Sequence, residues 1–69
     1  MKTNLRKYRF EHGDLSQQQL ADLIKVSRQT IVAIERGDYN LSVKLALLLA
    51  EKLGTTVEDL FQLEDKDYV

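Results

Sequence analysis

Apolar residues recur at helical spacing along most of the chain. Three stripes follow this spacing: Leu20, Leu23 and Ile24; Ile31 and Ile34; and Val57, Leu60 and Phe61. Residues 43–53 are apolar over an arc of roughly 260° at 100° per residue, far more than a one-sided helix needs. We therefore expect this segment to be the central, most enclosed helix, with Leu48 emerging on its far side.

Hydroxyl residues and glycines divide the apolar pattern into helices. Ser16, with Gln19 three residues later, is typical of a capping box, and a glycine that follows a helical segment is typical of its end. The candidate N-caps are Thr3, Ser16, Ser27, Ser42 and either Thr55 or Thr56, and the candidate terminators are Gly13, Gly37 and Gly54. The predicted helices cover about 3–12, 16–24, 27–36, 42–53 and 56–61, followed by a tail at 62–69.

These elements predict an all-α fold, a five-helix bundle that forms a single domain over residues 1–69. After the last helix, Phe61 and Leu63 alternate with Gln62 and Glu64, which is a strand-like pattern. The tail could therefore pair with residues 1–3 as a short terminal β-ribbon, or cross to a second copy of the chain.

The composition excludes several classes of protein. The chain has no cysteine and one histidine, so neither disulfides nor thiolate metal sites are available to it. No apolar run reaches the ~18 residues of a membrane span, and the N-terminal segment lacks the apolar core of a signal peptide. An enzyme is disfavoured because there is no Gly-rich phosphate loop and no room for a pocket of ~300 Å³ beside the core. We expect a cytoplasmic domain with no cofactor, metal, membrane or small-molecule partner.

Charge is divided unevenly along the chain. Residues 1–44 contain eight Lys or Arg against five Asp or Glu, whereas residues 45–69 contain two against six. A basic first half in a chain whose net charge is −1 indicates that this half meets a polyanion.

Lys25 and Val26 alone join the second and third predicted helices, so these helices are expected to meet at a wide angle. The stretch LSQQQLADLIKVSRQTIVAIERGDYN resembles the helix-turn-helix of the xenobiotic-response-element family, the Cro and phage-repressor type. The matching positions are Gln17, Ala21, Val26, Ser27, Thr30, Ile31, Ile34, Glu35 and Gly37. The resemblance covers residues 5–61 and implies that residues 27–36 form a recognition helix.

Such a helix lies in the major groove of double-stranded DNA. With Ile31 and Ile34 facing the core, the outer face presents hydrogen-bonding and methyl-bearing side chains, which suit the edges of guanine, adenine and thymine. The predicted base-contacting residues are Arg28, Gln29, Thr30, Val32 and Ala33. The alternative is that these side chains form an ordinary solvated face.

The resemblance also implies contacts to the DNA backbone. Gln17 would bind phosphate at the start of the second helix, and the loop after the third helix would line a second contact. The predicted phosphate-contacting residues are Gln17, Arg36, Tyr39, Asn40 and Lys44. Asp38 is unfavourable in this loop because the matching position is often basic.

Three further positions concern stability. Arg9 shares a helical face with apolar residues, so its charge needs a partner, and the resemblance supplies Glu35 in a structural ion pair; the alternative is that Arg9 reaches water. Lys25 occupies a turn position where the family often has a left-handed glycine, at a cost on the order of 1 kcal/mol. Leu41 replaces a proline that is common before the fourth helix.

The sequence thus predicts a sequence-specific DNA-binding transcriptional regulator, a dimeric repressor that reads a palindromic operator. The predicted homodimer interface comprises Leu47, Leu48, Phe61 and Leu63. The alternative for Phe61 is that it only closes the core of its own chain. The competing function is an antitoxin or protein-interaction module of the same fold, whose acidic C-terminal half binds a partner protein.

Overall fold

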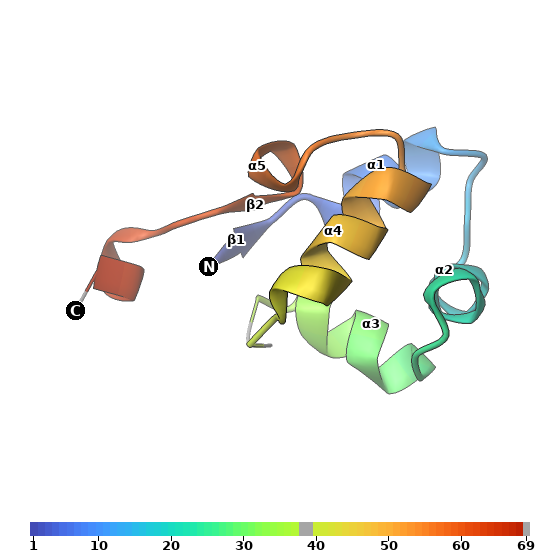
Figure 1. The fold of residues 1–69 in the computed structure, drawn as a ribbon, viewed down its shortest axis with the longest axis horizontal. Coiled ribbons are helices and arrows are strands. Elements are labelled where there is room, and N and C mark those ends of the chain that lie inside the picture. The colour runs from blue at the N-terminus through green and yellow to red at the C-terminus, as the bar shows by residue number, and fades with distance from the viewer. Residues whose placement is uncertain (38–39, 69) are drawn as a thin grey trace.

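The computed structural model describes residues 1–37 and 40–68, which fold into a helical bundle with a small two-stranded sheet (Figure 1). The elements are β1 (Lys2–Thr3), α1 (Leu5–Glu11), α2 (Gln17–Ile24), α3 (Arg28–Glu35), α4 (Val43–Lys52), α5 (Val57–Leu60), β2 (Phe61–Gln62) and the 3-10 helix η1 (Asp65–Tyr68). The predicted all-α fold with a terminal β-ribbon is therefore confirmed. The predicted tail contains a short helix, η1, that the sequence pattern did not indicate.

Most of the helices begin at the predicted hydroxyl residues. The Ser16 hydroxyl accepts the Gln19 backbone N–H at 3.0 Å, and the Gln19 side chain accepts the Ser16 backbone N–H at 2.8 Å, which completes the capping box. Ser27 and Ser42 cap α3 and α4 in the same way through their hydroxyls. At α5 the cap is Thr56 rather than Thr55.

The predicted start of the first helix at Thr3 is wrong, because Thr3 belongs to β1 and α1 begins at Leu5. Antiparallel pairing sets Lys2 opposite Gln62 and Thr3 opposite Phe61, so these residues are extended. Next to this pairing, the Asn4 backbone N–H donates a hydrogen bond of 2.8 Å to the carbonyl of Leu60. The ribbon thereby ties the start of α1 to the end of α5.

The core lies between the helices. α4 contributes Ala46, Leu49 and Ala50, and its C-cap Leu53 is also buried. The wide apolar arc of α4 is not fully enclosed, because Val43 and Leu47 are exposed. Leu48 emerges only in part, because it is half-buried and packs against the core. It lines a depression together with Ile24 and Val26, so the connection between α2 and α3 lies beside the side of α4 that was expected to face solvent.

The turn between α2 and α3 has the left-handed residue that the sequence indicated. Lys25 adopts φ 60° and ψ 48°, and the Val26 backbone N–H donates to the Ala21 carbonyl at 3.0 Å. Ala21 is fully buried, which allows the helices of this motif to pack closely. This short turn fixes where the N-terminal end of α3 lies relative to α2.

Candidate nucleic-acid interface

The helix α3 presents an apolar inner face and a polar outer face. Ile31 and Ile34 are buried in the core, whereas Arg28 and Gln29 are exposed at the N-terminal end of the helix. The remaining predicted base-contacting residues, Thr30, Val32 and Ala33, are half-buried. All of the predicted base-contacting residues thus retain accessible surface on one element of the fold.

The side chain of Thr30 already makes a hydrogen bond within the protein. The Thr30 hydroxyl lies 3.0 Å from the Ser27 hydroxyl, and the Thr30 backbone N–H donates to the same Ser27 oxygen. The hydroxyl of Thr30 therefore takes part in the N-cap of α3. Its methyl group is the part of the side chain best suited to meet a base.

The structure brings Arg9 and Glu35 together in a bidentate ion pair. The Arg9 Nε donates to Glu35 Oε2 at 2.9 Å, and the Arg9 Nη2 donates to Glu35 Oε1 at 3.3 Å. The third donor, Nη1, binds the Leu15 carbonyl at 2.6 Å. Arg9 is only 6 % exposed, so its charge is compensated inside the protein rather than by water. The pair joins α1 to the C-terminal end of α3.

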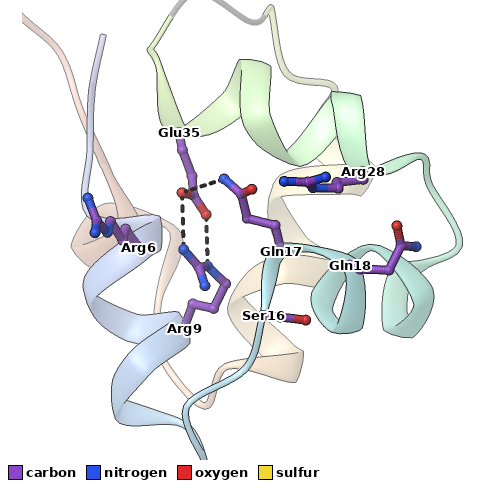
Figure 2. Close-up of a pocket in the computed structure, with 7 residues that line it drawn as sticks. All are labelled: Arg6, Arg9, Ser16, Gln17, Gln18, Arg28 and Glu35. Atoms are coloured by element: carbon purple, nitrogen blue, oxygen red, sulfur yellow. Dashed lines mark hydrogen bonds and ion pairs between the residues drawn. The ribbon is translucent and has the colours of Figure 1, made fainter.

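Gln17 belongs to the same hydrogen-bond network, which the sequence did not indicate. Its side-chain Nε2 donates to Glu35 Oε1 at 3.3 Å, so the amide is held against the ion pair (Figure 2). Gln17 is the first residue of α2, and only the packing of α2 against α3 brings it to Glu35. Because Glu35 anchors one end of the amide, the side chain has a defined orientation at the start of α2.

A pocket of about 630 Å³ surrounds this network, contrary to the expectation that the chain has no room for one. It is lined by Arg6, Arg9, Ser16, Gln17, Gln18, Arg28 and Glu35, from α1, α2, α3 and their connections (Figure 2). Three of these residues are arginines and one is an acid, so the lining is positively charged. Sequence reasoning missed Arg6, although its place three residues before Arg9 puts both on one face of a helix.

The other predicted phosphate-contacting residues lie after α3. Asn40 and Lys44 are exposed, and so is Arg36 at the C-cap of α3. Lys44 also lines a shallow depression with Val43 and Leu47 on α4. Tyr39, like the unfavourable Asp38, lies outside the described residues.

The residues predicted for a dimer interface differ in their exposure to solvent. Leu47 and Leu63 are exposed at 57 % and 62 %, and Leu48 is half-buried. Phe61 is only 8 % exposed and belongs to the core of its own chain, so its assignment to the interface is wrong. The reason is the register of the ribbon: Phe61 pairs with Thr3 of the same chain and turns its side chain inward, while Gln62 faces solvent.

No helix in residues 1–37 and 40–68 is long and apolar enough to cross a membrane. The sequence profile of the family described as Helix-turn-helix matches residues 5–60. An HTH-type transcriptional regulator of Methanocaldococcus jannaschii is 48 % identical over 67 residues, which are 97 % of this chain and all of the relative.

Controller proteins are also similar to the chain. The control protein C.SmaI of Serratia marcescens is 37 % identical over 57 residues, covering 83 % of this chain and 67 % of the relative. Among solved structures, the restriction-modification controller protein C.AhdI of Aeromonas hydrophila matches with a TM-score of 0.72 and 38 % identity, over 83 % of this chain and 85 % of the other. The chain belongs to the helix-turn-helix family and is a DNA-binding transcriptional regulator rather than an enzyme.

Proposed function

We propose that this regulator is a dimeric repressor that reads the two half-sites of a palindromic operator, with α3 of each copy in the major groove. The observation that supports this most directly is the division of α3 into a buried face and an accessible face. An exposed Arg28 and Gln29 at the N-terminal end of a recognition helix stand where such helices meet base edges.

The chemistry of the outer face suggests which bases it reads. A guanidinium such as that of Arg28 can donate two hydrogen bonds to guanine, and the amide of Gln29 can pair in the same manner with adenine. Val32 and Ala33 offer methyl groups to thymine, and so does Thr30, whose hydroxyl caps the helix. Each correct bidentate contact would contribute roughly 1–3 kcal/mol of discrimination against a wrong base.

Backbone contacts on both sides of α3 would orient the helix in the groove. On one side, Gln17 binds phosphate at the N-terminus of α2, with its amide held in place by Glu35. On the other side, Arg36, Asn40 and Lys44 are exposed and would approach the second strand of the DNA. Tyr39 stays a predicted member of this second group.

The exposed apolar residues of α4 support dimer formation. Val43, Leu47 and Leu48 line a shallow depression, and Leu63 adds an exposed apolar side chain in the tail. A second copy of the chain would remove these side chains from water. To read two half-sites on one face of DNA, a symmetric dimer has to hold its two copies of α3 about 34 Å apart, or a multiple of that.

A second candidate function uses the same apolar surface for a different protein, as an antitoxin does with its toxin. The observation that favours it is the acidic C-terminal part, where Glu64, Asp65 and Asp67 are exposed beside the exposed Leu63. The two functions differ in what the purified protein does alone. A repressor of the proposed kind sediments as a homodimer without any partner, whereas a partner-binding module stays monomeric until its partner is added.

The proposal is tested by selecting bound sequences from a pool of random double-stranded DNA. The expected result is an inverted repeat whose half-sites are centred about one helical turn apart, or a multiple of it. A reporter gene placed behind the selected sequence should be less active when the protein is present. Enrichment of a single unrepeated site, or increased reporter activity, would contradict the dimeric repressor.

A further inference from the structure

The pocket beside α2 has more positive charge than its own residues neutralise. Glu35 lines this pocket, and it is already engaged by Arg9 at 2.9 Å. Within residues 1–37 and 40–68, no carboxylate lies within ion-pair distance of Arg6 or Arg28, which also line it. The guanidinium groups of Arg6 and Arg28 therefore have no carboxylate counter-charge within the described residues. An anionic ligand would form charge-assisted hydrogen bonds with both guanidinium groups.

Arg6 is placed to act on the side of the pocket formed by α1. It is exposed, and its guanidinium lies 5.5 Å from the centroid of the Phe10 ring of the same helix, which restricts how far the side chain can swing. Arg6 and Arg28 stand on either side of Gln17 and Glu35 (Figure 2). The amide of Gln17 thus lies between two cations, one from α1 and one from the recognition helix.

We infer that Arg6 is a further DNA-contacting residue, which binds a backbone phosphate through its guanidinium on the α1 side of the pocket. This inference rests on the proposed function, because it places the phosphate next to the one that Gln17 is proposed to bind. An arginine suits this task since its planar fork matches two phosphate oxygens. The contact carries no base preference and extends the protein's footprint beyond the base pairs that α3 reads.

The test compares Arg6→Ala with Lys7→Ala on the sequence selected from the random pool. Lys7 is the neighbouring exposed cation of α1 and does not line the pocket, so both variants lose the same charge from the same helix. The proposed dimer carries two copies of Arg6, so Arg6→Ala removes two phosphate contacts and reduces the slope of log affinity against log salt by about 1.8. The loss caused by Arg6→Ala should therefore be about 12-fold larger at 50 mM than at 200 mM salt. Lys7→Ala should leave the slope unchanged.

The phosphate itself can be located by replacing single phosphates of the selected DNA with neutral methylphosphonates. The natural protein should lose affinity at several phosphates around each half-site, and at one of these, next to the phosphate of Gln17, replacement should cause no further loss in Arg6→Ala. Arg6→Lys should recover part of the salt slope, because it restores the charge without the fork. Circular dichroism checks that each variant is folded, and Arg6→Gln serves as the readout should Arg6→Ala lower the melting temperature.

The possible failures are distinguishable. If the natural protein enriches no sequence from the pool, the proposed function and this inference both fall. If it binds a selected site but Arg6→Ala and Lys7→Ala give equal salt slopes, only the inference falls. A full methylphosphonate effect in the Arg6→Ala protein at every flanking phosphate would likewise overturn it.

Discussion

The ion pair between Arg9 and Glu35 should be one of the largest single contributions to the stability of this small domain. Arg9 is 6 % exposed, and the Glu35 side chain is 10 % exposed, so neither charge can turn to water without disrupting its surroundings. Breaking a buried pair by removing one partner costs on the order of 3–5 kcal/mol. A domain of 69 residues has a total stability of roughly 3–10 kcal/mol, at about 0.05–0.15 kcal/mol per residue. Glu35→Leu should therefore remove a large fraction of the free energy of unfolding of the domain.

The hydrogen bonds of the ion pair determine how much stability each variant loses. Glu35→Leu strands the Arg9 guanidinium with a single acceptor, the Leu15 carbonyl at 2.6 Å. Glu35→Gln keeps a side-chain oxygen that can accept from Arg9, so its cost should be smaller by about 1–2 kcal/mol. Arg9→Met strands the Glu35 carboxylate, which retains only one of its three side-chain hydrogen bonds, the one from the Gln17 amide at 3.3 Å. Both apolar single variants should thus be severely destabilised.

The double variant Arg9→Met with Glu35→Leu removes both charges and keeps approximately the same volume. It should recover about 1–3 kcal/mol relative to the sum of the single losses, because no charge is left buried. The recovery is incomplete because the Leu15 carbonyl and the Gln17 amide lose their partners. The assay is urea unfolding monitored by circular dichroism, with equal slopes required for the comparison of midpoints. Strictly additive losses would refute the coupling and with it the electrostatic reasoning.

The remaining predictions concern DNA reading, assembly and the turn. Gln29→Ala should lose about 1–3 kcal/mol of binding free energy on the selected site and little on random DNA, whereas Lys44→Ala should weaken binding to both alike. The affinities are measured by fluorescence anisotropy, and equal losses of Gln29→Ala on the two DNAs would exclude Gln29 as a base reader. Leu47→Asp should stay folded and sediment as a monomer, since this side chain is exposed, and Leu63→Asp tests the tail in the same way; unchanged dimers from both would rule out this interface. Lys25→Gly should raise the free energy of unfolding by about 0.5–1 kcal/mol, because the residue is left-handed; a lower urea midpoint would contradict the strain.

Local signals in the sequence were enough to place the helices. A cap depends on residues within one turn of each other, so Ser16, Ser27 and Ser42 could be recognised without knowledge of the fold. The start of α1 could not be recognised in this way. It is displaced by pairing with β2, whose residues are about 60 positions away, and Thr3 is as suitable for a strand as for a cap.

Periodicity indicates that a face is apolar but does not say what covers it. The wide apolar arc of α4 was compatible with several rotations of the helix, and only packing against the turn at Val26 decided that Leu48 is half-buried while Leu47 is exposed. The alternation at Phe61 was likewise compatible with its own core or with a second copy. Arg6, and the hydrogen bond from Gln17 to Glu35, were harder still to predict, because their environment is made by side chains from three separate helices.

The antiparallel ribbon has a consequence for the order in which the domain folds. The helices and their caps need only local contacts, whereas the pairing of Lys2 with Gln62 closes a loop of about 60 residues and must offset the corresponding chain entropy. The ribbon should therefore assemble late and open first in the native state. The Asn4 amide proton, which is donated to Leu60 at 2.8 Å, should then exchange with solvent by local opening, while amides inside α4 exchange only when the whole domain unfolds.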